Sequence, residues 1–354
     1  MASGSPTITY GLRNASPTLT GALTAWNSAG AFAFSGEAIV AGVSFPDTLM
    51  TRPRGVSYAA DGSVWGAPGG WVEFEHTGDA FEIYQKGLTG GFRLWVDGEL
   101  SANAYPDNPT AESAGGLHYT LVEFGGSATR RIRLESLAGS LSFGGVYVKT
   151  GQSVAAPSYP LRLILVGDSF TEGTGAGNQA SGFAPMLAHE LGVADFRNSG
   201  SGGTGWEQNN PSLSRVNLDD RWTRDVVDPA PDMVVVAMGY NDLEDGNDVA
   251  IGAMAAAKLN ELREAVPGCL VHVLGPWDSN AYASAAPDAD AVSLTAALEE
   301  ACEGIPGVWF HSMLGVAFEP VGGGDIHPAL GGHTTIAHHG YDEIAAVHGL
   351  RPRS

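Results

Sequence analysis

The sequence predicts two domains of different fold class: an all-β sandwich, jelly-roll-like in its strand pattern, over residues 1–155, and an α/β domain over residues 156–354. The first part contains short segments in which apolar and polar residues alternate, separated by glycine-rich turns. The second part contains near-continuous apolar segments separated by helical periodicity, which indicates a parallel sheet with helices on both faces. Residues 151–160, rich in Gly, Ser, Ala and Pro, are the expected linker.

The elements of the first part follow from the alternating pattern. Strands are expected at residues 71–76, 81–85, 92–96, 118–122, 130–135 and 141–148. Asp97-Gly98 is a turn pair that predicts a hairpin after the third of them. Trp65, Trp71 and Trp95 either belong to the core of the sandwich or stack on sugar rings as exposed side chains.

The elements of the second part alternate between strand and helix. Strands are expected at residues 161–166, 193–197, 232–238, 270–274 and 308–311, and helices at 183–191, 249–266, 292–302 and 331–348. In such parallel sheets, ligands bind at the carboxyl ends of the strands. The loops at those ends are therefore where functional residues are expected.

The charge distribution excludes several classes of partner. Residues 1–155 hold 9 basic and 13 acidic residues (net −4), and residues 156–354 hold 9 and 26 (net −17). Without a basic cluster, such a field repels phosphate backbones and anionic lipids, so neither nucleic-acid nor membrane-surface binding is expected. No apolar run is long enough for a membrane span, and the first residues lack the features of a signal peptide. An extracellular or virion-associated location is favoured over a cytoplasmic one.

The chain contains two cysteines, Cys269 and Cys302. They either form a disulfide with each other or are two small buried apolar residues.

Polar residues follow the predicted strands at the expected edge. Ser169, after the first apolar strand, is either a nucleophile or the N-cap of the next helix. Asn241, after the third, is either an amide donor to a ligand or a turn residue bonded to its own backbone. His327 precedes the last helix and lies close to Asp325 in the sequence. It is either a base oriented by that carboxylate or an exposed loop histidine. Together these groups indicate acyl transfer.

Other site patterns are present only in part. Gly200, Gly202 and Gly205 have the spacing of a dinucleotide-binding loop, but they follow the second strand, and Pro211 interrupts before a helix is established. Residues 245–248 look like a calcium loop but lack its final carboxylate. The histidines of the last helix lack the spacing of a zinc motif. We therefore expect neither an organic cofactor nor a metal.

Taken together, the residues of these loops resemble the signature of the SGNH (GDSL) hydrolase family, and the resemblance covers roughly residues 160–349. Four signature blocks occur in order: Gly167-Asp168-Ser169, Asn198 with Gly203, Gly239-x-Asn241-Asp242, and His327-Pro328. The resemblance implies a three-layer α/β/α, flavodoxin-like parallel sheet. It also implies that Ser169 is the nucleophile and His327 the base. The oxyanion donors it implies are the amides of Ser169 and Gly203 and the side chain of Asn241. Asp168 is implied as a supporting residue.

The block around the histidine departs from the family pattern. The family usually places its acid three residues before the histidine, and Gly324 occupies that position here. Asp325 lies two residues before His327, and residues i and i+2 of an extended segment share a face. Asp325 is therefore expected to complete a triad; the alternative is a Ser–His dyad oriented by a backbone carbonyl.

The resemblance extends to two-domain carbohydrate esterases with an N-terminal β-sandwich, which the segment from Phe92 to Gly98 resembles. It implies a serine esterase that acts on short acyl esters, favouring acetyl, of a polysaccharide or cell-wall glycan, with the β domain as an accessory and possibly carbohydrate-binding module. The alternatives are a general arylesterase or thioesterase, a glycan-binding adhesin such as a phage tail protein with a deacetylase module, and an acyltransferase using the same serine. The expected partner is an acylated carbohydrate or a small ester.

Overall fold

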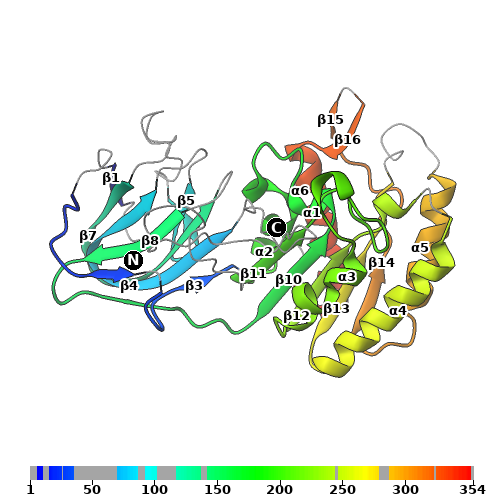
Figure 1. Cartoon of the computed structure of the whole chain (residues 1–354), viewed down its shortest axis with the longest axis horizontal. Coiled ribbons are helices and arrows are strands. Elements are labelled where there is room, and N and C mark those ends of the chain that lie inside the picture. Colours follow the sequence, from blue (N-terminus) through cyan, green and yellow to red (C-terminus); the bar gives the residue numbers. More distant parts are fainter. Residues whose placement is uncertain are drawn as a thin grey trace. The chain divides into compact units, whose positions relative to one another are not determined.

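The computed structural model describes residues 6–10, 16–25, 27–35, 70–86, 92–101, 117–136, 142–243, 246–278, 287–322 and 324–351. The described residues form two compact units (Figure 1). In the sequence, the boundary between them lies between Ser158 and Tyr159. Trp65 and Asp245, which enter the sequence expectations above, lie outside the described residues.

The first unit is an antiparallel β domain, which confirms the expected class. Its strands are β1 (Thr7–Tyr10), β2 (Leu23–Ala25), β3 (Ala33–Phe34), β4 (Trp71–Lys86), β5 (Phe92–Val96), β6 (Glu99–Leu100), β7 (Leu117–Ser136), β8 (Ser142–Val148) and β9 (Ser153–Ala155). They pair in the order β2-β8-β4-β7-β5-β6, with β1 on β7 and with β3 and β9 on β4. At the β5–β6 hairpin, Asp97 and Gly98 have φ of 53° and 84°, the positive angles that a type I′ turn requires.

Two pairs of predicted strands are in fact single long strands. Residues 71–76 and 81–85 belong to β4, and residues 118–122 and 130–135 belong to β7. The β4–β7 register shifts between Gly78 and Ala80, which indicates a bulge at this point. The prediction was wrong because such an irregularity interrupts the apolar–polar alternation without ending the hydrogen-bonded ladder.

The core of the first unit is aromatic. Phe74 and Phe81 pack edge to face, with ring centroids 5.3 Å apart. Trp71 is fully buried beneath the Arg133 guanidinium, 4.2 Å from the ring centroid. Trp95 is half-buried and donates its indole N–H to Glu135. Of the two alternatives for the tryptophans, the core position therefore applies to Trp71.

The second unit contains a five-stranded parallel sheet between helical layers (Figure 1). Its strands are β10 (Arg162–Gly167), β11 (Asp195–Gly200), β12 (Met233–Ala237), β13 (Leu270–Leu274) and β14 (Val308–His311). The helices are α1 (Ser169–Glu172), α2 (Phe183–Glu190), α3 (Leu218–Trp222), α4 (Asp248–Ala265), α5 (Ala289–Cys302) and α6 (Leu330–His348). Shorter elements are the 3₁₀ turns Gln179–Ser181, Pro211–Leu213 and Tyr240–Asp242, the π-helical turn Thr223–Val227, and the hairpin of β15 (Pro320–Gly322) and β16 (Asp325–Pro328).

The two helical layers bury different faces of the sheet. On one face, Ile251 of α4 and Leu294 of α5 pack with Val236 of β12 in the main hydrophobic core. On the other, Gly340 of α6 lies against Leu187 of α2 and Leu274 of β13. The strand order β11-β10-β12-β13-β14 is the flavodoxin-like order, so this part of the prediction is confirmed.

The register of the sheet places the loops after β10, β11 and β12 next to one another at the carboxyl edge of the sheet. Gly167 at the end of β10 is paired with Gly200 at the end of β11 and with Ala237 at the end of β12. Because the strands are parallel, the loops that follow them begin side by side. The chain reverses its strand order around β10, and this switch point is where open α/β sheets bind ligands.

Two further expectations concern isolated features. Cys269 and Cys302 are both free and buried, so they are not joined in a disulfide. Burial raises the pKa of each thiol to about 12. No helix within the described ranges has the length and apolar character needed to cross a bilayer.

Candidate active site

Ser169 begins the short helix α1, one residue beyond the strand–loop junction. Asp168 is the N-cap of this helix and accepts a hydrogen bond from the Phe170 N–H at 2.9 Å. The turn is tight at Gly167, where an added Cβ would lie 2.0 Å from Thr171 Oγ1 and 2.3 Å from the Ala237 carbonyl oxygen. Only glycine fits there without displacement, and the tight turn keeps the serine at the carboxyl end of β10.

Ser169, His327 and Asp325 form a continuous chain of contacts. The distance between Ser169 Oγ and His327 Nε2 is 2.9 Å. On the far side of the ring, His327 Nδ1 lies 2.6 Å from Asp325 Oδ1, and the His327 backbone N–H donates to the same oxygen at 3.0 Å. A carboxylate can only accept, so Nδ1 holds the ring proton and Nε2 is left to accept from the serine hydroxyl.

Asp325 and His327 both belong to β16, which explains how an aspartate only two residues before the histidine can contact its ring. In an extended strand their side chains project from the same face. The His327 backbone N–H, and then the ring N–H, lower the pKa of the Asp325 carboxyl below its usual value. Asp325 is largely exposed, at 44% of its side chain, so solvent screens its charge.

Gly203 lies in the loop after β11, next to the serine. Its φ of +74° is in the left-handed region that glycine favours. Within the described ranges, its N–H is not donated to any protein acceptor. The first N–H of a helix likewise has no intrahelical acceptor, and Ser169 provides that group in α1.

Asn198 and Asn241 connect the three loops at this edge. Asn198 Nδ2 donates to the Thr171 carbonyl at 2.9 Å, and its Oδ1 accepts from the Gly200 N–H at 2.9 Å. Asn241 donates from Nδ2 to the Thr204 carbonyl at 2.9 Å. That bond uses one of the two N–H groups of the Asn241 amide, so the other remains to be donated to a ligand.

Two buried aspartates lie close to these loops. Asp242 accepts from the backbone N–H groups of Trp206, Glu207 and Gln208 at 2.8, 3.1 and 3.1 Å. Asp168 is fully buried, and desolvation raises the pKa of its carboxyl to about 7. Its contact with the Phe170 N–H is that of a helix cap.

Sequence reasoning did not identify a buried arginine beneath the site. Arg221 is 1% exposed and donates to the carbonyls of Gly167 and Ser199 at 2.8 Å each. It also pairs with Asp225 at 3.0 Å. It therefore joins the ends of β10 and β11. The only signal in the sequence was the i, i+4 spacing of Arg221 and Asp225, which is common on exposed helix faces as well.

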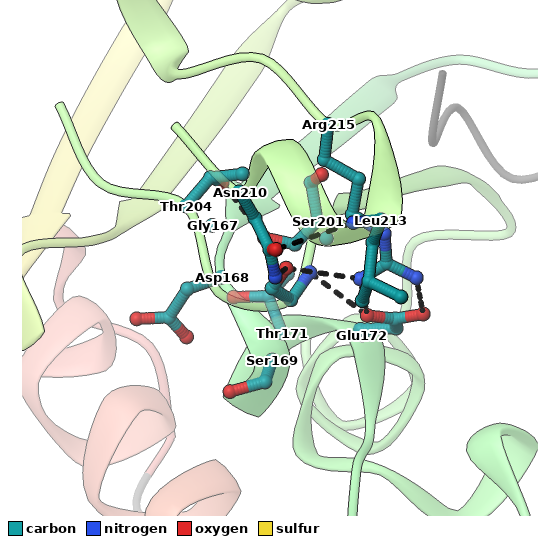
Figure 2. A network of polar contacts seen from close by, with 12 residues as sticks. Gly167, Asp168, Ser169, Thr171, Glu172, Ser201, Thr204, Asn210, Leu213 and Arg215 are labelled. Atoms are coloured by element: carbon teal, nitrogen blue, oxygen red, sulfur yellow. Dashed lines mark hydrogen bonds and ion pairs between the residues drawn. The ribbon is translucent and has the colours of Figure 1, made fainter. Parts of the chain in front are cut away.

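A second contact that the sequence did not indicate is the ion pair of Glu172 and Arg215, close to the loop between Ser201 and Thr204 (Figure 2). Nothing in their separation of 43 residues predicts it. No group of three or more His, Cys, Asp or Glu side chains in the described part of the chain has an arrangement that would hold a metal ion.

The fold and these contacts define a class of protein: a three-layer α/β/α domain of the SGNH type, as the sequence resemblance implies. Residues 165–334 match the model of the GDSL-like Lipase/Acylhydrolase family. The matched segment contains both Ser169 and His327.

Solved structures with a similar arrangement cover nearly the whole chain. An acetyl xylan esterase (Est2A) from the rumen bacterium Butyrivibrio proteoclasticus shares 17% identity and a TM-score of 0.58, covering 98% of this chain and 99% of its own. A family two carbohydrate esterase from Clostridium thermocellum in complex with cellohexaose shares 17% identity and a TM-score of 0.57, covering 90% and 99%. The salicylyl-acyltransferase SsfX3 from a tetracycline biosynthetic pathway shares 16% identity and a TM-score of 0.61, covering 99% and 98%.

The similarity in fold to these structures, one of them a family two carbohydrate esterase, therefore includes the N-terminal β domain as well as the α/β domain. A comparison with curated proteins finds no match.

Proposed function

We propose that this protein is a serine esterase that hydrolyses short acyl esters, with acetyl groups on a polysaccharide or cell-wall glycan as the favoured substrate. The observation that supports it most is the chain of contacts from Asp325 through His327 to Ser169. In this proposal Ser169 is the nucleophile, His327 is the general base and Asp325 orients the ring.

The reaction proceeds in two halves. Ser169 Oγ attacks the ester carbonyl carbon while its proton passes to His327 Nε2, and a tetrahedral oxyanion forms. When this intermediate collapses, the bond to the alcohol breaks and the alcohol leaves with the proton from His327. Water then attacks the acyl-serine carbonyl while His327 takes its proton, and a second tetrahedral intermediate forms. When it collapses, the bond to Ser169 Oγ breaks, His327 returns the proton to the serine, and the carboxylic acid leaves.

Three donors stabilise the oxyanion in this proposal: the N–H groups of Ser169 and Gly203 and the second N–H of the Asn241 amide. One such donor contributes about 3 kcal/mol to the transition state in comparable sites. Asp168, capping α1, supports the loop and takes no part in the proton transfer. No step of this scheme needs a cofactor.

The substrate class is supported by charge and by resemblance. Residues 156–354 have a net charge of −17, which repels strongly acidic polymers and favours a neutral acylated glycan. Two of the similar structures are described as an acetyl xylan esterase and as a family two carbohydrate esterase bound to cellohexaose. We propose the β domain, residues 1–155, as an accessory module that places the hydrolase domain on such a polymer.

The proposal is tested by an acetate-release screen over acetylated xylan, pectin, peptidoglycan and simple aryl esters. We expect release from at least one acetylated glycan and its loss in Ser169→Ala. Undiminished hydrolysis by Ser169→Ala would contradict the scheme. Faster turnover of aryl esters or thioesters than of every glycan would instead favour the general arylesterase or thioesterase alternative.

Transfer of the acyl group to another alcohol is a second candidate, favoured by the match to the salicylyl-acyltransferase over 99% of this chain. The acyl-serine is the same, and a sugar or phenol hydroxyl replaces water as the second nucleophile. The two activities are separated by supplying an acceptor alcohol and measuring ester product against free acid.

The adhesin alternative predicts that the full-length Ser169→Ala protein still binds glycan tightly.

A further inference from the structure

The two backbone polar groups of Gly202 are hydrogen-bonded to side chains from two separate segments. The Gly202 N–H donates to Glu172 Oε2 at 2.8 Å. The Gly202 carbonyl accepts from Asn210 Nδ2 at 3.2 Å and from Arg215 Nη1 at 3.1 Å. Both polar groups of Gly202 are therefore fixed, although the residue has no side chain of its own.

The side chains that make these bonds are themselves tightly joined. Arg215 and Glu172 form a two-pronged ion pair, Nη1 to Oε2 at 2.7 Å and Nη2 to Oε1 at 2.9 Å (Figure 2). Their side chains are only 14% and 16% exposed, so solvent screens the pair less than it would a surface pair. Asn210 and Arg215 also exchange backbone hydrogen bonds at 3.0 and 2.9 Å, which close the intervening turn.

Peptide geometry transmits this arrangement to the neighbouring amide. In a planar trans peptide, the carbonyl of one residue and the N–H of the next point in opposite directions. Fixing the Gly202 carbonyl therefore fixes the direction of the Gly203 N–H, which is one of the proposed oxyanion donors. Gly202 lies directly against the nucleophile: a Cβ added to it would lie 3.3 Å from Ser169 Cβ.

Glu172 also selects which amide of the loop is available. It takes up the Gly202 N–H, so that group is not free to donate to a substrate. Glu172 ends the helix that Ser169 begins, so one four-residue element bears the nucleophile and orients the adjacent loop.

We propose that Glu172, Asn210 and Arg215 are positioning residues that set the direction of the Gly203 N–H for the oxyanion. This inference rests on the proposed esterase function. It assigns a positioning role to three residues, none of which is hydrogen-bonded to His327 or Asp325 in the described part of the chain.

The test uses the full-length protein and the best ester from the screen, with Arg215→Ala, Arg215→Lys and Asn210→Ala. We expect Arg215→Ala to lower kcat about 10- to 100-fold, because a donor displaced by a fraction of an ångström is weakened rather than lost. KM should change less than about 3-fold, since a transition-state contact contributes little to ground-state binding. Arg215→Lys, which keeps one charged donor, should recover part of kcat, and Asn210→Ala should lose less than Arg215→Ala.

A boronic acid provides a readout that a merely structural role would not alter. Ser169 Oγ adds to the boron of phenylboronic acid, the serine proton passes to His327, and the resulting anionic tetrahedral adduct occupies the oxyanion position. Its dissociation constant should rise in each variant by the same factor as kcat/KM falls. Arg162→Ala is the matched control, because it removes a part-buried ion pair with Asp195 at the opposite end of the same sheet. It should leave both values within about 3-fold.

Each outcome distinguishes this inference from the proposed function. If Ser169→Ala remains active, the proposed function fails and this inference falls with it. If Ser169→Ala is inactive but Arg215→Ala keeps the wild-type kcat and boronate affinity, only this inference is overturned. Equal losses in Arg162→Ala and Arg215→Ala would also overturn it. Should Arg215→Ala fail to fold, Arg215→Lys and Asn210→Ala decide by the same two measurements.

Discussion

At the scale of single residues, a position that departs from the family pattern is compensated by local geometry. Gly324 stands where the family usually has its acid, yet Asp325 reaches the His327 ring because β16 is extended. The aspartate also accepts the backbone N–H of His327. This double contact keeps the carboxylate beside the histidine although it is exposed to solvent.

Replacing Asp325 with asparagine tests this contact. The amide retains the shape but carries no charge, and it can present a donor to Nδ1, which favours the wrong ring tautomer. We expect kcat/KM to fall at least about 10-fold, less than at a buried triad because water screens the Asp325 charge. Glu123→Gln, a change of an exposed carboxylate in the other unit, is the control. A rate within a few-fold of wild type, with His327→Ala inactive, would favour the dyad.

Asn241 offers a second test at the same scale. Asn241→Ala removes one proposed oxyanion donor together with the bond to the Thr204 carbonyl. Loss of one such donor lowers kcat by about 10²- to 10³-fold in comparable sites. We expect a drop of this size with KM nearly constant, measured by steady-state hydrolysis of an aryl acetate. If the loss appeared only in KM, Asn241 would be a binding residue and not an oxyanion donor.

At the scale of elements, the local pattern predicted more of the second unit than of the first. Apolar runs identified the parallel strands because both faces of that sheet are covered, and the loops at their ends followed from topology. In the first unit, β4 and β7 were each predicted as two strands, because Gly78 and the Gly125–Gly126 pair resemble turns in a sequence read locally. Only pairing with a neighbouring strand keeps such segments extended.

The same limit explains the missed site residues. The contact of Glu172 with Arg215 and that of Arg221 with Gly167 join positions 43 and 54 residues apart. Their formation depends on how the loops after β10 and β11 fold back on the sheet edge. The serine and histidine were predictable because glycine, aspartate and proline neighbours mark their loops, whereas charged residues without such neighbours resemble ordinary surface.

The turn between β10 and α1 can be tested as an element. Gly167→Ala would place a methyl group against the Ala237 carbonyl and Thr171 Oγ1, at 2.3 and 2.0 Å. Such overpacking typically costs about 1–3 kcal/mol of unfolding free energy, and we expect a lower melting temperature together with reduced activity. Gly268→Ala is the matched control, since an added Cβ there meets nothing within 4 Å. Equal melting temperatures for the two variants would contradict the role assigned to Gly167.

At the scale of the whole molecule, we expect stability in acid to depend on a row of histidines at the β13–β14 side of the sheet. His272 Nδ1 lies 2.9 Å from His311 Nε2, and His272 Nε2 lies 3.0 Å from His348 Nε2. His311 Nδ1 in turn lies 3.2 Å from Glu343. Burial, and then the neighbouring His311 and His348, lower the pKa of His272 to about 3 from 6.5. The folded protein therefore keeps this ring neutral at pH values where the unfolded chain protonates it.

The consequence is a loss of stability in acid. Below pH 6.5 the unfolded state binds a proton that folded His272 does not bind until about pH 3, so its contribution is complete above pH 6.5 and decreases as the pH falls through that window. A single group of this kind changes the free energy of unfolding by up to about 1.4 kcal/mol per pH unit. Asp168 acts in the opposite direction, because its raised pKa of about 7 makes the folded state take up a proton first.

Comparing a His272 variant with the wild type separates the contribution of His272 to the pH dependence of unfolding from that of opposing groups such as Asp168. We expect the free energy of unfolding, from urea titrations between pH 5 and 7, to depend less on pH in His272→Gln than in the wild type, even though the variant is less stable at pH 7. The difference in slope should approach about 1 kcal/mol per pH unit. Gly268→Ala, which changes no titratable group and adds a Cβ that meets nothing within 4 Å, should keep the wild-type slope. Parallel curves for His272→Gln and the wild type would mean that the buried ring takes up its proton in the folded state, and that the row of histidines does not limit stability in acid.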